Sequence, residues 1–364
     1  MFLPKFTMPA RRVAALTLAL TLCLQFSLGA APASAAPNPH ARPAPTDDGT
    51  PAEDVLAAVK RALRGTDIPG LSVAVLADDG REWAGTAGVR QDGKRLKVND
   101  QLAIGSITKT FTAAIILALV DEGRIELDAP ANRYLPKVRL VRDVTVRQLL
   151  NHTSGIDDLY RPTLPWLKER PGKALGSNDV LRSVGPRNFV AGTSYSYSNT
   201  NYYLLGHIIE VVTHKSFSKE LASRFTGPLD LDRTRLLTAD DKLMPPAWSS
   251  AFWTSGAMAS TPTDLAKWGK ALYGGELLSR AGMRRMLDFP AGRPYGLGTQ
   301  LFSLDGRKMI GHSGLLYDTT SLLVRTEGIT VALVATAPSA NVFGALVGRH
   351  GGPSLIDAIT RLVG

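Results

Sequence analysis

The chain has 364 residues, a single cysteine and a formal net charge of +10. This length is enough for a large core in one domain or in two closely joined domains. The basic residues are scattered, with Arg284-Arg285 the nearest approach to a cluster, which argues against a nucleic-acid-binding protein. The positive surplus instead indicates a solvated surface, or nonspecific attraction to an anionic cell envelope.

The N-terminus has the pattern of a secretory signal peptide. Basic residues precede an apolar run at 13–28, and the small residues at 33–36 predict cleavage after Ala35. The run is short for a membrane span, and no stop-transfer pattern follows it. Arg11-Arg12 permits twin-arginine export, but its flanking residues favour the general secretory route. We expect residues 1–35 to be removed and the mature protein to be secreted, with no membrane span.

Cleavage changes both the charge and the thiol content of the chain. Three basic residues leave with the signal peptide, which lowers the formal net charge from +10 to +7. The only cysteine, Cys23, leaves too, so we expect neither a disulfide nor thiol catalysis. Residues 36–50 are rich in Ala and Pro and predict a disordered spacer, and the folded part is expected to begin near Pro51.

In the folded part, predicted strands stand at both ends and predicted helices stand between them. Residues 52–64 show an amphipathic helical pattern, and 71–76 and 82–89 predict a hairpin. Helical patterns then follow at 108–122, 145–151, 200–213, 217–224, 262–273 and 279–287. Strand-like runs return at 295–303, 308–311, 319–325 and 329–335, and a helix is expected from about residue 340.

This order predicts an α/β protein of the α+β type. One antiparallel sheet would be built from both chain ends and flanked by terminal helices, with a mainly helical domain inserted. We expect the sheet domain to comprise residues 51–105 and 290–364, and the helical domain to comprise 106–289.

Ser106-Ile107-Thr108-Lys109 is the first candidate catalytic motif. It stands at a predicted helix start, where residues three apart lie on one face. A neutral Lys109 would take the proton of Ser106, and the helix N-terminus favours developing negative charge. The spacing alone is weakly specific, because Ser216-Phe217-Ser218-Lys219 repeats it by chance.

Tyr197-Ser198-Asn199 is the chain's one Tyr-x-Asn sequence. A phenol beside an ammonium such as Lys109 is expected to have a lowered pKa and to relay protons. Asn199 offers an amide that can bind a substrate carbonyl and orient Lys109. The alternative interpretation is an ordinary loop before a helix, capped by Asn199 or Thr200.

His312-Ser313-Gly314 follows the strand-like run at 308–311 and is expected at the end of that strand. The backbone N–H of Leu315, together with that of Ser106, would form an oxyanion hole. Gly314 allows a substrate backbone to approach closely, and His312 adds a polar group that can carry a charge.

In this order the three motifs resemble those of the serine β-lactamase and D-Ala-D-Ala carboxypeptidase superfamily. The resemblance is to the branch of class C β-lactamases, secreted carboxypeptidases and related esterases, and it includes the blocks at 103–111, 148–156, 197–202 and 311–314. It implies a β-lactamase/transpeptidase-like fold with the active site in the groove between sheet and helices. It also implies that Ser106 is the nucleophile, Lys109 its base partner and Tyr197 a proton shuttle. The implied substrate-binding residues are Asn199, His312, Ser313, Gly314 and Leu315.

The implied function is a serine hydrolase that works through an acyl-enzyme on Ser106. A D-Ala-D-Ala carboxypeptidase or another D-amino-acid peptidase of cell-wall peptides is favoured, because class C β-lactamases usually carry Lys where this chain has His312. Gln300 departs from the carboxypeptidases, whose arginine there grips the substrate carboxylate. Leu315 and Tyr317-Asp318 also depart from the family's usual residues. An esterase, a β-lactamase, and a non-catalytic penicillin-binding or muropeptide-sensing domain stay open.

Other chemistries have weaker signals. The chain has no Gly-x-Ser-x-Gly sequence, which argues against an α/β-hydrolase. We interpret His152, in the Asn-His-Thr-Ser-Gly turn, as structural, and the remaining histidines lack metal-ligand spacing. We therefore expect no metal, no cofactor and no obligate protein partner, and a small-molecule or peptide substrate such as a cell-wall peptide, a β-lactam or an ester.

Overall fold

The computed structural model describes residues 51–64, 68–160, 167, 169–304, 307–338 and 359. The expected signal peptide and spacer lie outside these ranges, as does the expected C-terminal helix apart from Ile359. Within these ranges, no helix is long and apolar enough to cross a membrane. The expectations for the two chain ends stay predictions.

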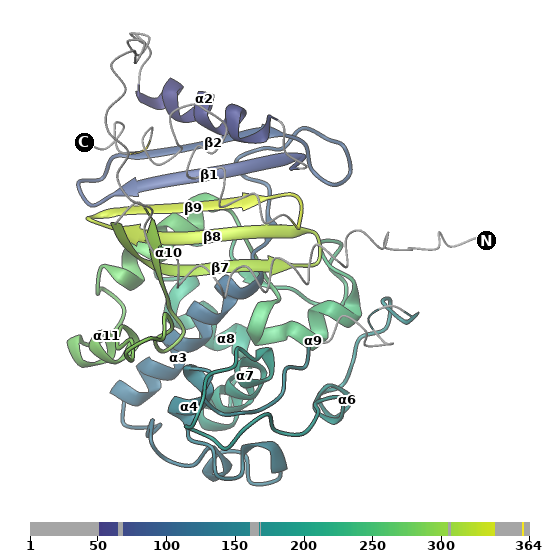
Figure 1. Ribbon diagram of the computed structural model, residues 1–364. Helices are drawn as coiled ribbons and strands as arrows, with labels where there is room; N and C mark the ends of the chain where they lie inside the picture. The colour runs from purple at the N-terminus through teal and green to yellow at the C-terminus, as the bar shows by residue number, and fades with distance from the viewer. Residues whose placement is uncertain are drawn as a thin grey trace, which may run out of the picture.

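A six-stranded antiparallel sheet joins segments from both ends of the described chain (Figure 1). Its strands are β1 (Gly70–Ala77), β2 (Glu82–Gly88), β6 (Gln300–Leu304), β7 (Arg307–Leu316), β8 (Thr319–Thr326) and β9 (Ile329–Ala335). They follow the order β2-β1-β9-β8-β7-β6, and each neighbouring pair is antiparallel. The two segments meet where β1 pairs with β9, with Leu71 opposite Ala335. This arrangement confirms the predicted sheet built from both chain ends.

Helices cover both faces of this sheet. α2 (Pro51–Leu63) packs on one face, where Val55 and Val59 join an apolar cluster with side chains of β1, β8 and β9. α10 (Pro262–Tyr273) packs against the same strands from the opposite face. Because both faces are covered, nearly every residue of β1 is buried, which explains its continuous apolar run in place of strict alternation.

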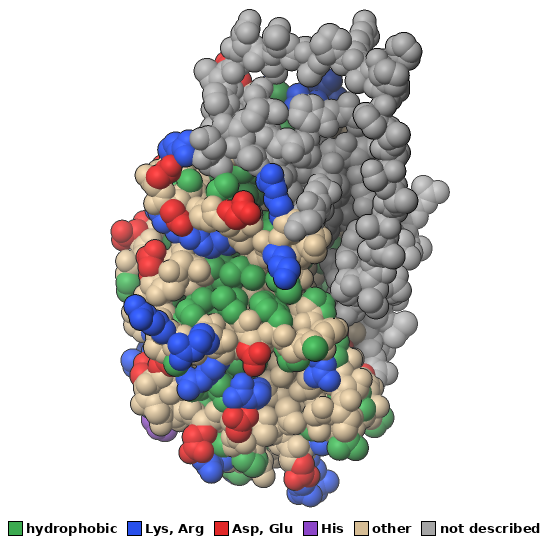
Figure 2. All heavy atoms as spheres, turned by 60° about the vertical axis from the view of Figure 1, so that its left-hand side comes forward, with side chains coloured by type: hydrophobic (Ala, Val, Ile, Leu, Met, Phe, Trp, Pro, Cys, Tyr) green, Lys and Arg blue, Asp and Glu red, His purple; other side chains and the backbone are tan. Residues whose placement is uncertain are grey.

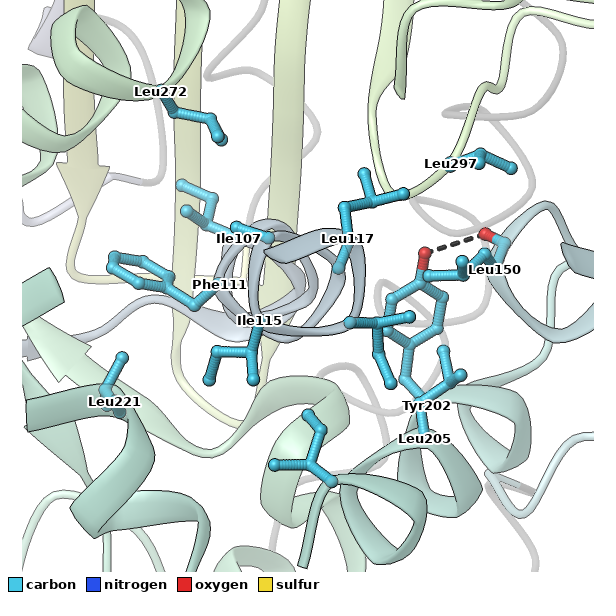
Figure 3. Close-up of a cluster of buried hydrophobic side chains, with 14 of the residues drawn as sticks. Ile107, Phe111, Ile115, Leu117, Leu150, Tyr202, Leu205, Leu221, Leu272 and Leu297 are labelled. Carbon is cyan, nitrogen blue, oxygen red and sulfur yellow. Dashed lines mark hydrogen bonds between the residues drawn. The ribbon is translucent and has the colours of Figure 1, made fainter. Parts of the chain in front are cut away.

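α3 (Thr108–Asp121) forms the centre of the helical layer (Figure 3). All residues from Thr108 to Leu117 are buried, so the helix has no polar face. The close-up shows its side chains pointing in several directions toward neighbouring elements. On one side, the ring of Phe111 stacks on that of Trp268 at a centroid distance of 3.9 Å. A helix held on all sides gives the residues at its N-terminus a rigid base.

The other helices surround α3 on the same side of the sheet (Figure 1). They are α4 (Val146–Leu150), α6 (Ser177–Arg182), α7 (Asn199–Thr213), α8 (Phe217–Leu221), α9 (Pro246–Gly256) and α11 (Arg280–Met286), with short turns of helix at Ala131–Arg133, Arg139–Val141 and Ala222–Thr226. Each helix predicted between residues 108 and 287 is present, whereas the sequence pattern does not reveal α6 and α9. α9 is interrupted at Trp253, whose φ of 29° is not helical. We keep the division into a sheet domain and a helical domain as a proposal.

A second, three-stranded sheet lies beside α3 and is absent from the prediction. It consists of β3 (Leu102–Ala103), β4 (Arg235–Leu236) and β5 (Met258–Ser260) in the order β3-β5-β4. Strands of two or three residues are too short to show an alternating pattern. This sheet fixes the chain just before Ser106.

Two predicted strands near the C-terminus have different limits in the structure. β6 begins at Gln300, while Tyr295 makes only an isolated bridge to it. β7 continues to Leu316, so His312-Ser313-Gly314 lies inside the strand and the prediction that it follows the strand end is wrong. The glycines of this strand allow close packing, because a Cβ on Gly311 would lie 1.9 Å from the Leu323 carbonyl oxygen.

Charged side chains are mixed on the face shown in Figure 2. Lys and Arg lie among Asp and Glu around an apolar area, without one continuous basic patch. This face agrees with the scattered basic residues of the sequence, and the expectation of no nucleic-acid partner stays a prediction.

Candidate active site

Ser106 lies in a 3-10 turn, η1 (Gly105–Ile107), that runs directly into α3. The chain before the turn is held from two sides. The Ile104 N–H donates to the Met258 carbonyl of β5 at 2.9 Å, and the Ser321 hydroxyl of β8 donates to the Ile104 carbonyl at 2.7 Å. The Ser106 side chain itself is partly exposed and lines a pocket. The serine therefore stands at the predicted helix start, on a fixed backbone.

Lys109 is completely buried in the first turn of α3. Its Nζ lies 3.0 Å from Ser106 Oγ, 2.7 Å from Asn199 Oδ1 and 2.7 Å from the Ser255 carbonyl oxygen. Burial lowers the pKa of Lys109 from 10.5 to about 7, although the charge of Asp158 acts in the opposite direction. A large fraction of this amine is therefore neutral near pH 7.

The three partners match a neutral amine. Such an amine has two N–H donors and one lone pair, whereas the Asn199 amide oxygen and the Ser255 carbonyl only accept. When the amine is neutral, these two acceptors use both of its donors and leave the lone pair for the hydroxyl of Ser106, whereas the protonated amine donates to all three partners. The arrangement can take a proton from Ser106, which is the chemistry expected of a general base.

Tyr197 lies over the same amine, with its ring centroid 4.9 Å from Lys109 Nζ. Burial desolvates its phenol and holds the pKa well above the usual 10, although Ser106 acts in the opposite direction. The expected lowering of the Tyr197 pKa is therefore wrong. The sequence does not show that the neighbouring lysine is itself largely neutral or that the phenol is desolvated. Tyr197 stays protonated and can act as a proton donor.

Asn199 begins α7 and connects Lys109 to a carboxylate that the sequence reasoning missed. Its Nδ2 donates to Asp158 Oδ2 at 3.2 Å, and its backbone N–H donates to Asp158 Oδ1 at 2.9 Å. The Tyr160 N–H also donates to Asp158 Oδ1, at 3.1 Å. Burial raises the pKa of Asp158 to about 6, against the opposite effect of these hydrogen bonds and of Lys109. The sequence feature that could have pointed to Asp158 is the acidic pair Asp157-Asp158, which directly follows Gly155-Ile156.

His152 contacts the Tyr197-Ser198-Asn199 motif through ring packing and a hydrogen bond. It is fully buried, and its ring packs against that of Tyr197 at a centroid distance of 4.3 Å. Its Nδ1 accepts from the Ser198 backbone N–H at 3.1 Å and faces Asn201 Nδ2 at 3.3 Å. Burial and the nearby Lys109 lower its pKa well below 6.5, so the ring is neutral. These contacts match the structural interpretation of His152.

His312 is also buried and neutral. Its Nδ1 lies 2.6 Å from the Ser313 carbonyl, which only accepts, so Nδ1 carries the proton and Nε2 accepts from the Tyr295 hydroxyl at 2.9 Å. Burial lowers the His312 pKa to about 3. Histidine is a residue type that can carry a charge, but His312 is neutral at this buried position. Beside it, Gln300 Oε1 accepts from both the backbone N–H and the hydroxyl of Ser313, at 2.8 and 3.0 Å.

The turn that carries Ser106 and strand β7 come into backbone contact through two glycines. A Cβ on Gly314 would lie 2.2 Å from the Ile104 carbonyl oxygen, and one on Gly105 would lie 3.0 Å from the Leu315 nitrogen. Gly105 also has a φ of +51°. The Leu315 nitrogen therefore lies beside the Ser106 turn, where the expected oxyanion hole needs it.

A small pocket opens at this point. It is lined mostly by apolar side chains, with Ser106 and Asn199 as its polar members; the others are Tyr160, Phe252, Gly256, Leu315 and Leu316. Among the described residues, no group of His, Cys, Asp or Glu could hold a metal ion. The structure thus brings together Ser106, Lys109, Tyr197, Asn199 and Leu315, with His312, Ser313 and Gly314 on the adjoining strand.

The second Ser-x-x-Lys sequence has a different environment. Ser216 is the N-cap of α8 and accepts from the Lys219 backbone N–H at 3.3 Å. Both side chains are exposed. Lys219 therefore lacks the enclosed surroundings that Lys109 has.

Comparison with known proteins places the chain in a family. Residues 55–351 match the Beta-lactamase family, which covers most of the chain, and the chain belongs to that family. Penicillin-binding protein 4 of Amycolatopsis lactamdurans is 28% identical over 335 residues, covering 78% of this chain and 86% of that protein. A D-aminopeptidase of Brucella anthropi is 29% identical over 274 residues, covering 68% of this chain and 52% of that protein. The chain thus spans only about half the length of that aminopeptidase.

Solved structures show the same fold. A D-stereospecific amidohydrolase from Streptomyces superposes with a TM-score of 0.70 at 29% identity, covering 82% of this chain and 99% of that one. A D-amino acid amidase from Ochrobactrum anthropi SV3 superposes with a TM-score of 0.72 at 24% identity, covering 85% and 99%. These comparisons confirm the predicted superfamily and fold, and the chain is a serine hydrolase.

Proposed function

We propose that this protein is a secreted serine hydrolase that forms an acyl-enzyme on Ser106 and cleaves peptides or amides of D-amino acids. The observation that carries the proposal is the buried amine of Lys109, which has Ser106 as its third partner. The D-amino-acid substrate is supported by the Brucella D-aminopeptidase and the Streptomyces D-stereospecific amidohydrolase, each 29% identical to this chain.

Acylation would follow from the geometry of the site. Ser106 Oγ bonds to the substrate carbonyl carbon, and its proton passes to Lys109 Nζ. The backbone N–H groups of Ser106 and Leu315 stabilise the oxyanion. The C–N bond then breaks as Tyr197 gives its proton to the departing amine and receives one from Lys109. Water then attacks the carbonyl carbon of the acyl-enzyme, with the proton transfers in the reverse direction. The bond to Ser106 Oγ breaks, Ser106 regains its proton, and the acid is released.

The surroundings of Gln300 favour an aminopeptidase or amidase over a carboxypeptidase. A carboxypeptidase needs a cation for the terminal carboxylate of its substrate. Gln300 is neutral, and its side-chain oxygen is already hydrogen-bonded to Ser313. No cationic side chain is among the described residues that line the pocket. We therefore infer that the leaving amine of the preferred substrate carries no terminal carboxylate. The acyl part that becomes bound to Ser106 is then released as the acid.

The pocket indicates the side chain of that acyl part. Tyr160, Phe252 and Leu316 are among its lining residues, so its surface favours an apolar side chain over a charged one. The signal-peptide pattern supports export, and cell-wall peptides are a source of D-amino acids outside the cell. We therefore propose apolar D-aminoacyl amides as substrates, with cell-wall peptides as the source of their D-amino acids.

A substrate panel tests this proposal. The mature protein is assayed for kcat/KM on D-leucine and D-alanine p-nitroanilides, their L-enantiomers, a D-Ala-D-Ala tripeptide, p-nitrophenyl acetate and nitrocefin. We expect the D-leucine substrate to be best and its L-enantiomer to be at least tenfold poorer. Faster cleavage of the D-Ala-D-Ala bond would identify a carboxypeptidase, and turnover of the ester or nitrocefin alone would contradict a peptidase.

The nucleophile is tested within the same chain. Ser106→Ala should abolish covalent labelling by a fluorophosphonate or penicillin probe. Ser216→Ala removes the serine of the second Ser-x-x-Lys sequence and should leave labelling unchanged, because that hydroxyl only caps α8. Labelling that survives in Ser106→Ala would reject the assignment of the nucleophile.

A further inference from the structure

Asp158 is a polar group that the steps above do not use, although it is one residue removed from the reacting atoms. It lies in the loop after the His152 turn and accepts from three N–H groups, two of them on Asn199. Its two oxygens have separate partners, since Oδ1 accepts from the backbone N–H groups and Oδ2 accepts from the Asn199 side chain. Its contact with Lys109 runs through Asn199.

These partners determine which way the Asn199 amide points. The two ends of an amide differ only in being acceptor or donor. A carboxylate only accepts, so the NH2 end must face Asp158. The carbonyl end must then face Lys109 Nζ, at 2.7 Å. With the opposite orientation, the NH2 group would meet the N–H donors of Lys109, and its oxygen would meet a carboxylate.

The amide orientation matters because it decides how Lys109 uses its lone pair. With Asn199 Oδ1 and the Ser255 carbonyl as acceptors, both N–H groups of the neutral amine are engaged and the lone pair faces Ser106. Without the Asn199 acceptor, one N–H is free to turn toward Ser106 Oγ. The lysine would then donate to the hydroxyl from which it should accept.

We propose that Asp158 is a positioning residue for catalysis, which fixes the Asn199 amide so that the lone pair of Lys109 faces Ser106. The proposal rests on the proposed role of Ser106 as nucleophile, but it does not depend on which substrate is cleaved. The proposal concerns which group donates and which accepts in each hydrogen bond. The acceptor and the donor can be exchanged between positions 158 and 199, because Asp and Asn have nearly the same size.

Asp158→Asn is the first test. The backbone N–H groups of Tyr160 and Asn199 keep the oxygen of the new amide on their side, which turns its NH2 group toward Asn199 Nδ2. Two donors then face each other, and Asn199 turns over. We expect the fluorophosphonate labelling rate at pH 8 to fall by about tenfold to a hundredfold, which is part of the 10²–10⁴-fold that general-base catalysis supplies in full. Asn199→Asp alone should lose a similar factor, because two carboxylates would face each other.

The reciprocal double variant Asp158→Asn/Asn199→Asp is the decisive test. The amide at 158 would donate to the carboxylate at 199, so the hydrogen bond between these two side chains is kept with its direction reversed. The carboxylate would still accept from Lys109, and the oxygen of the amide would still accept from the two backbone N–H groups. We expect labelling at pH 9 to return to within about fivefold of the wild type. A negative charge in contact with Lys109 raises its pKa by about one unit or more, so the midpoint of the acid limb should move to higher pH. The other titratable groups around Lys109 are neutral near pH 7, namely Tyr197, Tyr202, His152 and His312.

Asp157→Asn is the matched control. It removes a carboxylate from the adjacent position, where Asp157 Oδ2 accepts from the Gly185 N–H at 3.1 Å. Its labelling rate should stay within about twofold of the wild type. A role limited to stabilising the start of α7 predicts a lower melting temperature for Asp158→Asn, with no rescue in the double variant and no shift of the midpoint.

The outcomes separate the two proposals. Wild-type labelling in Asp158→Asn, or a double variant that is no faster than the single variants and has an unshifted midpoint, would overturn the positioning role. A wild type that labels at Ser106 but cleaves no D-aminoacyl substrate would reject the proposed substrate and leave the positioning test intact.

Discussion

Lys109 should give the acylation rate a steep dependence on pH near neutrality. Its pKa is lowered from 10.5 to about 7, a shift that corresponds to about 5 kcal/mol between its two protonation states. Only the neutral amine accepts the Ser106 proton, so activity is lost as the pH falls through 7. At pH 6 about one tenth of the amine is neutral, and the labelling rate should be about one tenth of its alkaline plateau. Below pH 6, protonation of Asp158 should steepen the loss further.

The assay is the second-order rate constant for fluorophosphonate labelling from pH 5 to 10 at constant ionic strength. Lys109→Met should lose the rate across the whole range. Lys219→Met removes the exposed lysine of the second Ser-x-x-Lys sequence and should match the wild type. A rate that keeps rising to pH 10 would show an ordinary lysine, and a flat profile would show that Lys109 is not the base. Either result would refute the reasoning.

The same titration should appear in stability. The unfolded state holds the Lys109 proton up to about pH 10.5, whereas the folded state releases it near 7. Between these values the unfolded state binds more protons, so the free energy of unfolding rises with pH by up to about 1.4 kcal/mol per unit from this group. Below pH 7 both states are protonated and this slope vanishes. Chemical denaturation at pH 7 and 9 should show the rise in the wild type and its loss in Lys109→Met.

Two further substitutions test the remaining parts of the site. Tyr197→Phe keeps the ring on His152 but removes the proton donor, so amide turnover should fall by about a hundredfold or more while the melting temperature changes little, and unchanged turnover would contradict the proton relay. Gly314→Ala places a Cβ 2.2 Å from the Ile104 carbonyl oxygen, so it should lower the free energy of unfolding by about 1–3 kcal/mol and remove most labelling. Gly172→Ala, where a Cβ meets nothing within 4 Å, is its control, and equal labelling in the two variants would argue against the backbone contact.

The fold was largely predictable because its main elements are long and strongly patterned. Buried helices such as α3 and covered strands such as β1 carry their apolar residues in continuous sequence. The short strands β3, β4 and β5 depend on hydrogen bonds between distant segments, which no local pattern records. The extent of β7 was missed because the strand-like run at 308–311 continues through the polar residues and glycine of His312-Ser313-Gly314, which make close backbone contacts.

The site was predictable in its residue types but not in its protonation. The three motifs identify Ser106, Lys109 and Tyr197, and the structure places them together. Burial is a property of the assembled fold, so the raised pKa of Tyr197 and the neutral state of His312 were not visible in sequence. Asp158 was missed because it acts through Asn199, and an acidic residue in a loop is usually a solvated one.

The pairing of β1 with β9 has a consequence for how the newly synthesised enzyme folds. Leu71 can pair with Ala335 only after the segment up to β9 has been synthesised, and β7, which lines the pocket, is made just before it. Contacts that span most of a sequence form slowly, so the nascent chain remains open for longer than a protein built from local contacts. An open chain is the form that threading across a membrane requires. The topology that completes the catalytic groove would thereby also delay its activity until the proposed export is under way.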